Sequence, residues 1–241
     1  MASPHSQSFR ATFPKTDLEE RQPPTPSQSE ALQILATEHW SLLATRSLIY
    51  QESLGRVNMF LGILSGAVIA LALVAQASHF SSAFYAVAVF MLAVVFFTGI
   101  ATIRRLLMLN RDDYHTVVGM NRLRHGYFDR HPELEPYFIT SGFDDLAGAL
   151  RTLGLEVETA QGLGTFFHGF VTLPGMVGVI VAAVGGAIGA LAALGFGAPT
   201  SVAILAGAAC FVATEVLIFV TGRRSFRGFG PSAKPRFPTP K

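Results

Sequence analysis

The sequence contains little cysteine and little charge. Cys210 is the only cysteine among 241 residues, so a disulfide within the chain is excluded and a thiolate metal site would lack ligands. Charged residues make up 14% of the chain, whereas a soluble domain has about 25%. The hydrophobic share is 50% and the mean hydropathy is +0.43. This composition predicts a membrane protein, and Cys210, which lies in an apolar run, is expected to be a packed core residue.

The motifs of common catalytic sites are missing as well. The sequence has no phosphate-binding loop, no dinucleotide-binding glycine pattern, no metalloprotease His pair and no serine-hydrolase elbow. His115, His125 and His131 lack the i, i+4 spacing of a helical zinc motif. The net charge of +2 is too small to indicate a nucleic-acid partner. We therefore expect no enzyme, no metal, no cofactor and no bound nucleic acid.

Four long apolar stretches are present, each free of Lys and Arg. They cover residues 57–76, 83–103, 173–194 and 201–221, and a bilayer core of about 30 Å needs roughly 20 apolar residues in a helix. Short links at 77–82 and 195–200 join them in pairs. The sequence therefore predicts an all-α membrane protein with four transmembrane helices, arranged as two hairpins (57–103 and 171–221) with a small helical cytoplasmic domain.

The basic residues predict the orientation of the chain. All 18 Lys and Arg residues lie before the first stretch, between the second and third, or after the fourth, and the two short links contain none. Positively charged segments stay on the cytoplasmic side of a membrane. We expect a multi-pass protein of the plasma (inner) membrane with both termini in the cytoplasm.

The segments outside the membrane predict four further regions. These are a disordered tail rich in Ser and Pro (1–29), a cytoplasmic amphipathic helix (30–56), a helical segment (104–170) and a basic, Pro-rich tail (222–241). Ser27 and Glu30 have the spacing of a capping box at the start of a helix. Ser141 with Asp144 indicates a second cap, before a short helix that Gly154 would end.

The helix at 30–56 carries an apolar stripe, which comprises Leu32, Leu35, His39, Leu42, Leu43, Ile49 and Tyr50, with Trp40 beside it. Two interpretations remain open. The helix can pack on the rest of the cytoplasmic part. Alternatively, it lies in the membrane interface or pairs with another subunit.

Glu215 is the one charged residue within the four stretches. Carboxylates inside a membrane are costly, so they mark ion paths, proton relays or polar contacts between helices. Asn58 and His168 are expected at a similar depth and are candidate partners. Ion or proton handling and a structural polar contact both remain open for Glu215.

Small residues recur four positions apart in three of the stretches, as Gly62 and Gly66, as Gly185 and Gly189, and as Ala203 and Gly207. Such spacing lets helix backbones approach closely in lipid. It predicts tight packing either within one chain or in a homo-oligomer.

Arginines in the central segment predict contacts with the lipid bilayer. The set comprises Arg104, Arg105, Arg111, Arg122 and Arg124. Anionic headgroups of the inner leaflet are the expected ligand, and a nucleotide or another phosphate compound is the alternative.

Three segments carry a resemblance to known proteins: residues 37–46 (Thr-Glu-His-Trp-Ser-Leu-Leu-Ala-Thr-Arg), residues 65–73, and residues 119–125 followed by Pro136-Tyr137-Phe138. In these the chain resembles a family of bacterial four-span membrane proteins without an assigned activity. That resemblance implies an inner-membrane setting and no catalysis. The layout of residues 31–130 also resembles the two-span effector modules of bacterial defence systems, without a shared motif.

Three functional classes follow. A structural or regulatory membrane protein that assembles with itself or with a partner needs only the packing motifs and the cytoplasmic helices, and we prefer it. An ion channel or pore-forming effector with Glu215 near the conduction path is the alternative. A small transporter or membrane-embedded enzyme is third.

Overall fold

The structure is a computed structural model that describes residues 27–154, 172–227 and 234–240. Within this part of the chain every regular element is a helix, in the order α1 (Gln28–Ser78), α2 (Ser82–Phe128), the short 3-10 helix η1 (Pro132–Tyr137), α3 (Leu146–Thr152), α5 (Leu173–Gly195) and α6 (Thr200–Arg227). The predictions for residues 1–26 and for 155–171, His168 included, lie outside the described residues.

The chain has four helices that are long and apolar enough to cross a membrane, namely α1, α2, α5 and α6. The prediction of an all-helical protein with four candidate membrane spans is therefore confirmed at this level. Two of the helices are much longer than a span requires, because α1 has 51 residues and α2 has 47. At 1.5 Å per residue they are about 75 and 70 Å long, more than twice the hydrocarbon core.

The surplus length forms an extension that we call the stalk, which comprises residues 28–56 of α1 and 104–128 of α2. The predicted regions 30–56 and 57–103 share one continuous helix, since α1 runs without interruption from Gln28 through the apolar stretch to Ser78. The predicted capping box is present at its start, where the Glu30 backbone N–H donates to Ser27 Oγ and the Ser27 N–H donates to Glu30 Oε2. Helix α2 likewise continues from its apolar stretch into the stalk without a break and ends at Phe128.

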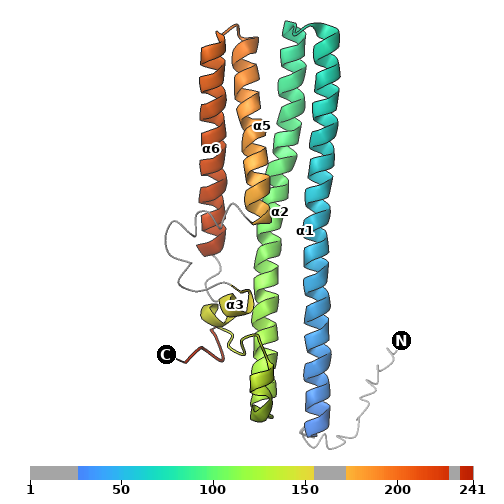
Figure 1. Cartoon of the computed structure of the whole chain (residues 1–241), viewed down its shortest axis with the longest axis vertical. Helices are drawn as coiled ribbons and strands as arrows, with labels where there is room; N and C mark the ends of the chain where they lie inside the picture. Colours follow the sequence, from blue (N-terminus) through green and yellow to red (C-terminus); the bar gives the residue numbers. More distant parts are fainter. Residues whose placement is uncertain (1–26, 155–171, 228–233, 241) are drawn as a thin grey trace, which may run out of the picture.

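The four long helices stand in a row, in the order α1, α2, α5 and α6 (Figure 1). Helix α2 packs against α1 on one side and α5 on the other, and α6 packs against α5. Because α1 and α6 end the row, each has one helical neighbour along most of its length (Figure 1).

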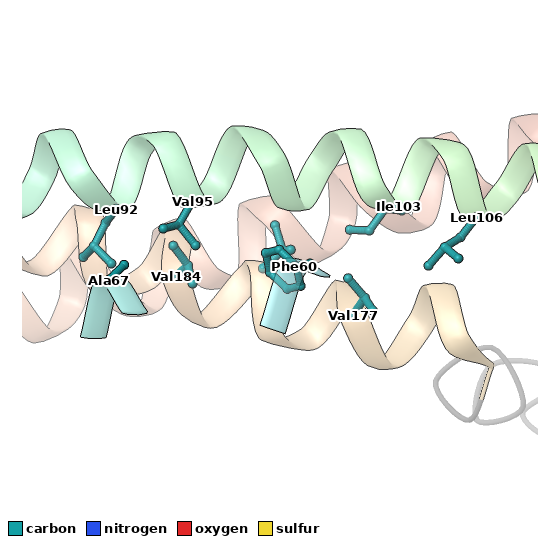
Figure 2. Close-up of a cluster of buried hydrophobic side chains, with 9 residues drawn as sticks. Phe60, Ala67, Leu92, Val95, Ile103, Leu106, Val177 and Val184 are labelled. Atoms are coloured by element: carbon teal, nitrogen blue, oxygen red, sulfur yellow. The ribbon is translucent and has the colours of Figure 1, made fainter. Parts of the chain in front are cut away.

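The core lies where α1, α2 and α5 meet. Figure 2 shows Phe60 of α1 at the centre of this cluster. The other buried members are Ala67 of α1, then Leu92, Val95, Ile103 and Leu106 of α2, and Val177, Val181 and Val184 of α5. Gly99 of α2 makes this meeting point possible, since a side chain there would collide with Phe60 and Val181. The absence of a side chain at Gly99 lets α1 and α5 approach the same turn of α2.

In the stalk, α1 and α2 pack along a seam with the spacing of a coiled coil. Positions 32, 35, 39, 42, 46, 49 and 53 alternate steps of three and four residues, and they are all at least half-buried. The ring of His39 stacks near Tyr127, with centroids 6.1 Å apart. Arg46 lies on this apolar seam and forms an ion pair with Asp113 of α2, with 2.8 Å between Nε and Oδ1. The first interpretation of the helix at 30–56, packing on another helix outside the span, therefore describes one of its faces.

Helix α3 packs against the stalk end of α2. The cap predicted from Ser141 and Asp144 is wrong, because Asp145 occupies the N-cap and its carboxylate accepts from the Gly148 N–H at 2.8 Å. Ser141 instead accepts from the nearby Phe143 N–H. The prediction for Gly154 is confirmed, since it follows the helix with a φ of 72°, a conformation that favours glycine. The Asp144 carboxylate therefore does not cap α3 and can accept other hydrogen bonds.

Candidate functional site

The structure separates the predicted intramembrane polar residues. Glu215 lies on α6 and the exposed Asn58 lies on α1, so they belong to the two outer helices of the row. The Oε1 atom of Glu215 is buried and has no hydrogen-bond partner among the described residues. A carboxylate in this position is costly unless it is paired or protonated.

The small residues fall into two groups with different surroundings. Those of α5 and α6 lie where these helices meet: Ala203 is buried, a Cβ on Gly189 would be 2.6 Å from Cys210 Sγ, and one on Gly207 would be 3.0 Å from the Gly186 carbonyl oxygen. A Cβ on Gly185 would lie 2.8 Å from Thr214 Oγ1. These glycines therefore serve packing within one chain. Cys210 was predicted to be a core residue, and that is wrong, because it is exposed on α6 although its sulfur lies against Gly189.

Gly62 and Gly66 of α1 behave differently. A Cβ added at either position would meet nothing within 4 Å. No contact among the described residues uses their spacing, so it remains available to lipid or to a second copy.

The five predicted headgroup arginines do not converge on one site. Arg105 makes a two-pronged ion pair with Glu52 of α1, at 2.9 and 3.0 Å. Arg122 pairs with Asp144 at 2.5 Å, and the buried Arg124 donates to Asn121. Arg104 and Arg111 are exposed and make no ion pair within the described residues, so of the five only these two retain a free charge for a headgroup.

Glu52 joins the two helices near the start of the apolar stretches. Its carboxylate accepts from Arg105 of α2 and from Arg56 of its own helix. The hydrogen bond from Arg105, and then that from Arg56, lowers the pKa of Glu52 to about 2. The carboxylate therefore stays ionised at any physiological pH and holds two guanidinium groups at this level of the stalk.

A buried polar centre organises the other end of the stalk. Asn121 is fully buried on α2, and its Nδ2 donates to the Phe143 carbonyl at 2.8 Å. Its Oδ1 accepts from Arg124 Nη1 at 2.7 Å and from Thr152 Oγ1 at 2.9 Å. One amide thus fixes the loop before α3 and the end of α3 to α2. Its neighbours are far apart in sequence, so sequence reasoning did not find it.

The C-terminal segment, residues 234–240, lies against this centre, although the sequence predicts only a Pro-rich tail there. Figure 1 shows this segment beside α3. Asp144 accepts the backbone N–H groups of Arg236 and Phe237, at 2.9 and 2.8 Å. Asp145 accepts the N–H and the hydroxyl of Thr239, at 3.0 and 2.8 Å. We call Asp144, Asp145 and His125 the aspartate site.

Both aspartates titrate abnormally. Burial alone would raise the pKa of Asp144, but hydrogen bonds from the Arg236 backbone and from Arg122 outweigh it and place the pKa below its ordinary value. For Asp145, burial is outweighed in the same way by the Gly148 N–H and by Thr239, which lower the pKa. Both side chains therefore stay charged, as acceptors of N–H groups.

Within the described residues, no group of three or more His, Cys, Asp and Glu side chains could hold a metal ion. No family model, no curated protein and no solved structure matches the chain. The resemblance to bacterial four-span proteins stays a prediction, and function has to be argued from the residues themselves.

Proposed function

We propose that this chain is a structural or regulatory membrane protein that assembles with a second copy of itself, through a face of the α1 stalk that α2 does not cover. In this proposal the four spans form two hairpins, the stalk and α3 form a cytoplasmic domain, and both termini lie in the cytoplasm of a bacterial cell. The proposed activity is the assembly of α1 of one copy with α1 of another, and no catalysed reaction is proposed.

One observation supports the proposal. Of the six large apolar side chains that α1 exposes in the stalk, four follow one another at a heptad-like spacing: Trp40 (71% exposed), Leu43 (41%), Tyr50 (53%) and Leu54 (51%). We call them the α1 stripe. Each directly follows a position of the seam that contacts α2 (39, 42, 49 and 53), so the stripe lies beside that seam, and its exposure shows that no described residue buries it. A contiguous apolar patch outside a membrane indicates an interaction surface.

Lipid is a poor candidate to cover the α1 stripe. Because α1 continues without a break, Trp40 lies about 25 Å along the helix from residue 57, where the apolar stretch begins. A helix whose later residues cross the bilayer leads its earlier residues away from it. This geometry argues against the predicted placement in the membrane interface and favours pairing with another subunit.

A second copy fits the α1 stripe in length and in chemistry. The partner has to follow a straight helix for about 21 Å, starting near the membrane surface, and α1 of another copy has that length and the same apolar residues. Trp40 and Tyr50 would together remove roughly 300 Å² of each copy from water. A stable interface buries about 800 Å² per partner, so Leu43, Leu54 and the exposed apolar residues that continue the same face of α1 into the span would supply the rest.

The test is the mass of the full-length protein in mild detergent, measured by native mass spectrometry over a range of concentrations. We expect a dimer that dissociates in the double variant Trp40→Glu/Tyr50→Glu. Leu48→Glu is the matched control, because Leu48 is 64% exposed on another face of the same stalk helix and should leave the dimer intact. A wild-type monomer at all concentrations, or equal dissociation by Leu48→Glu, would refute the proposal.

An ion-conducting assembly is a second candidate, and it is favoured by the buried Oε1 atom of Glu215, which has no hydrogen-bond partner in the described part of the chain. In liposomes that contain the purified protein, Glu215→Gln should then change the ion flux. Verified insertion without any flux would count against conduction and leave assembly as the proposed activity.

A further inference from the structure

The contact between the C-terminal segment and the aspartate site is extensive for so short a peptide. Besides the four hydrogen bonds accepted by the two carboxylates, the Asp144 backbone N–H donates to the Phe237 carbonyl at 3.0 Å. The Phe237 ring stacks on His125, with 4.0 Å between centroids and 24° between planes. Backbone, carboxylate and aromatic contacts therefore hold three neighbouring residues, Arg236, Phe237 and Thr239.

The aspartate site is built by groups that do not belong to the segment. Arg122 holds the Asp144 carboxylate, whose side chain has no exposed surface. Asp145 is fixed as the N-cap of α3 by the Gly148 N–H. Asn121 anchors the Phe143 carbonyl, directly before the two aspartates. Because these bonds orient both carboxylates, the acceptors stay in place when the segment leaves, and such preorganisation lowers the cost of binding.

The sequence of the segment matches the pattern of donors that the site requires. The backbone N–H groups of residues 236, 237 and 239 are all bound by the aspartates. Positions 235, 238 and 240 are proline, which has no N–H to leave unsatisfied and favours an extended chain. The prolines that predict a disordered tail therefore also fit a ligand that is already extended before it binds.

We propose that the aspartate site is a peptide-recognition site for the sequence Arg-Phe-Pro-Thr, and that the chain's own C-terminal segment occupies it as a latch. Asp144 accepts hydrogen bonds from two consecutive backbone N–H groups, and His125 stacks on the aromatic ring. Asp145 accepts from the N–H and the hydroxyl of the threonine. The latch ties the segment that follows α6 to His125 of α2 and to Asp145, the N-cap of α3.

The covalent link makes a modest intrinsic affinity sufficient. Only residues 228–233 separate α6 from the segment, and short linkers give effective concentrations of about 1 mM. An intrinsic Kd of about 0.1 mM would then keep the site roughly nine-tenths occupied. A free peptide should therefore bind roughly tenfold more weakly to the full chain than to one without the segment.

The experiment measures binding of a labelled peptide, Lys-Pro-Arg-Phe-Pro-Thr-Pro-Lys, to the purified membrane protein by fluorescence anisotropy. We expect saturable binding to a chain that ends at residue 233, with a Kd of about 0.1 mM or tighter, and binding to the full chain that is weaker by a factor of about ten or more. Equal binding to both chains would overturn the latch, because the segment would not then occupy the site. Absence of saturable binding to the shortened chain would overturn the recognition site itself.

Two kinds of variant keep the result independent of folding. A peptide with Phe237→Ala leaves the protein untouched and should bind about tenfold more weakly, because the aromatic stack is lost. In the protein, Asp144→Asn should weaken binding by a similar factor, since a charged acceptor becomes neutral. The matched control Asp112→Asn alters an exposed aspartate of α2 and should bind the peptide normally. If the Phe237→Ala peptide binds as well as the original, the proposed recognition is wrong.

Discussion

Replacing Gly189 by alanine puts a methyl group into the contact between α5 and α6. Its carbon would lie 2.6 Å from Cys210 Sγ and 3.0 Å from the Ala206 carbonyl oxygen, closer than van der Waals contact. The sulfur can rotate away, but the carbonyl belongs to the α6 backbone, so the two helices must separate. Overpacking of this kind costs about 1–3 kcal/mol.

Gly66→Ala is the matched control for Gly189→Ala. It introduces the same methyl group into another of the four candidate membrane spans, at a position with nothing within 4 Å. Both changes gain the same helix propensity, about 1 kcal/mol, which cancels when the two variants are compared. We therefore expect Gly189→Ala to be less stable than Gly66→Ala by about 1–3 kcal/mol.

The assay is reversible unfolding by SDS in mixed micelles, followed by circular dichroism. Adding Cys210→Ala to Gly189→Ala should recover part of the lost stability, because it removes the nearest atom, and a double-mutant cycle isolates that share. Free energies of unfolding of Gly189→Ala and Gly66→Ala within about 0.5 kcal/mol of each other would show that α5 and α6 do not approach as closely as described.

Two further predictions concern the stalk. Asn121→Leu should lower the free energy of unfolding of the stalk by about 2–4 kcal/mol, because three hydrogen-bond partners lose the buried amide. Denaturation of the full chain measures the loss, with Asn58→Leu as the control at an exposed site. Equal losses in the two variants would contradict the prediction. The latch should open in acid, because the pKa values of Asp144 and Asp145 are lowered in the bound state. The contact should be complete above the ordinary aspartate pKa of about 3.9 and should be lost as the pH falls from there through the lowered pKa values. Hydrogen exchange of the Arg236 and Phe237 amides, corrected for intrinsic rates, should show that their protection is lost in that pH range while the amides of α5 stay protected. If the two amides keep their protection to a lower pH than those of α5, the prediction is wrong.

Features encoded within a few residues were predictable from the sequence. The capping box at Ser27, the end of α2 before Pro132 and the left-handed Gly154 all follow from local backbone chemistry. The four candidate spans follow from composition alone. Each of these signals is complete in one stretch of sequence, so no tertiary information is needed to read it.

Features that depend on distant partners were not predictable. Arg122 belongs to a basic run that resembles a headgroup site, yet its partner is Asp144, 22 residues away. The donors to Asp144 from Arg236 and Phe237 lie more than 90 residues away. Likewise, the spacing of Gly62 and Gly66 equals that of Gly185 and Gly189, but among the described residues a Cβ would meet another helix at the second pair and nothing within 4 Å at the first. The role of each of these residues depends on its contacts in the folded structure, and the spacing of residues along the chain does not reveal those contacts.

The unbroken course of α1 gives the stalk the properties of a mechanical lever. Residues 28–56 contain no proline and continue the helix of the span directly. A tilt of the span by about 10° would move the free end of the stalk, about 43 Å away, by about 7 Å. Bilayer thickness or lateral pressure, which sets that tilt, would thereby be converted into a displacement far from the lipid, large enough to align or misalign the Trp40 region of two copies.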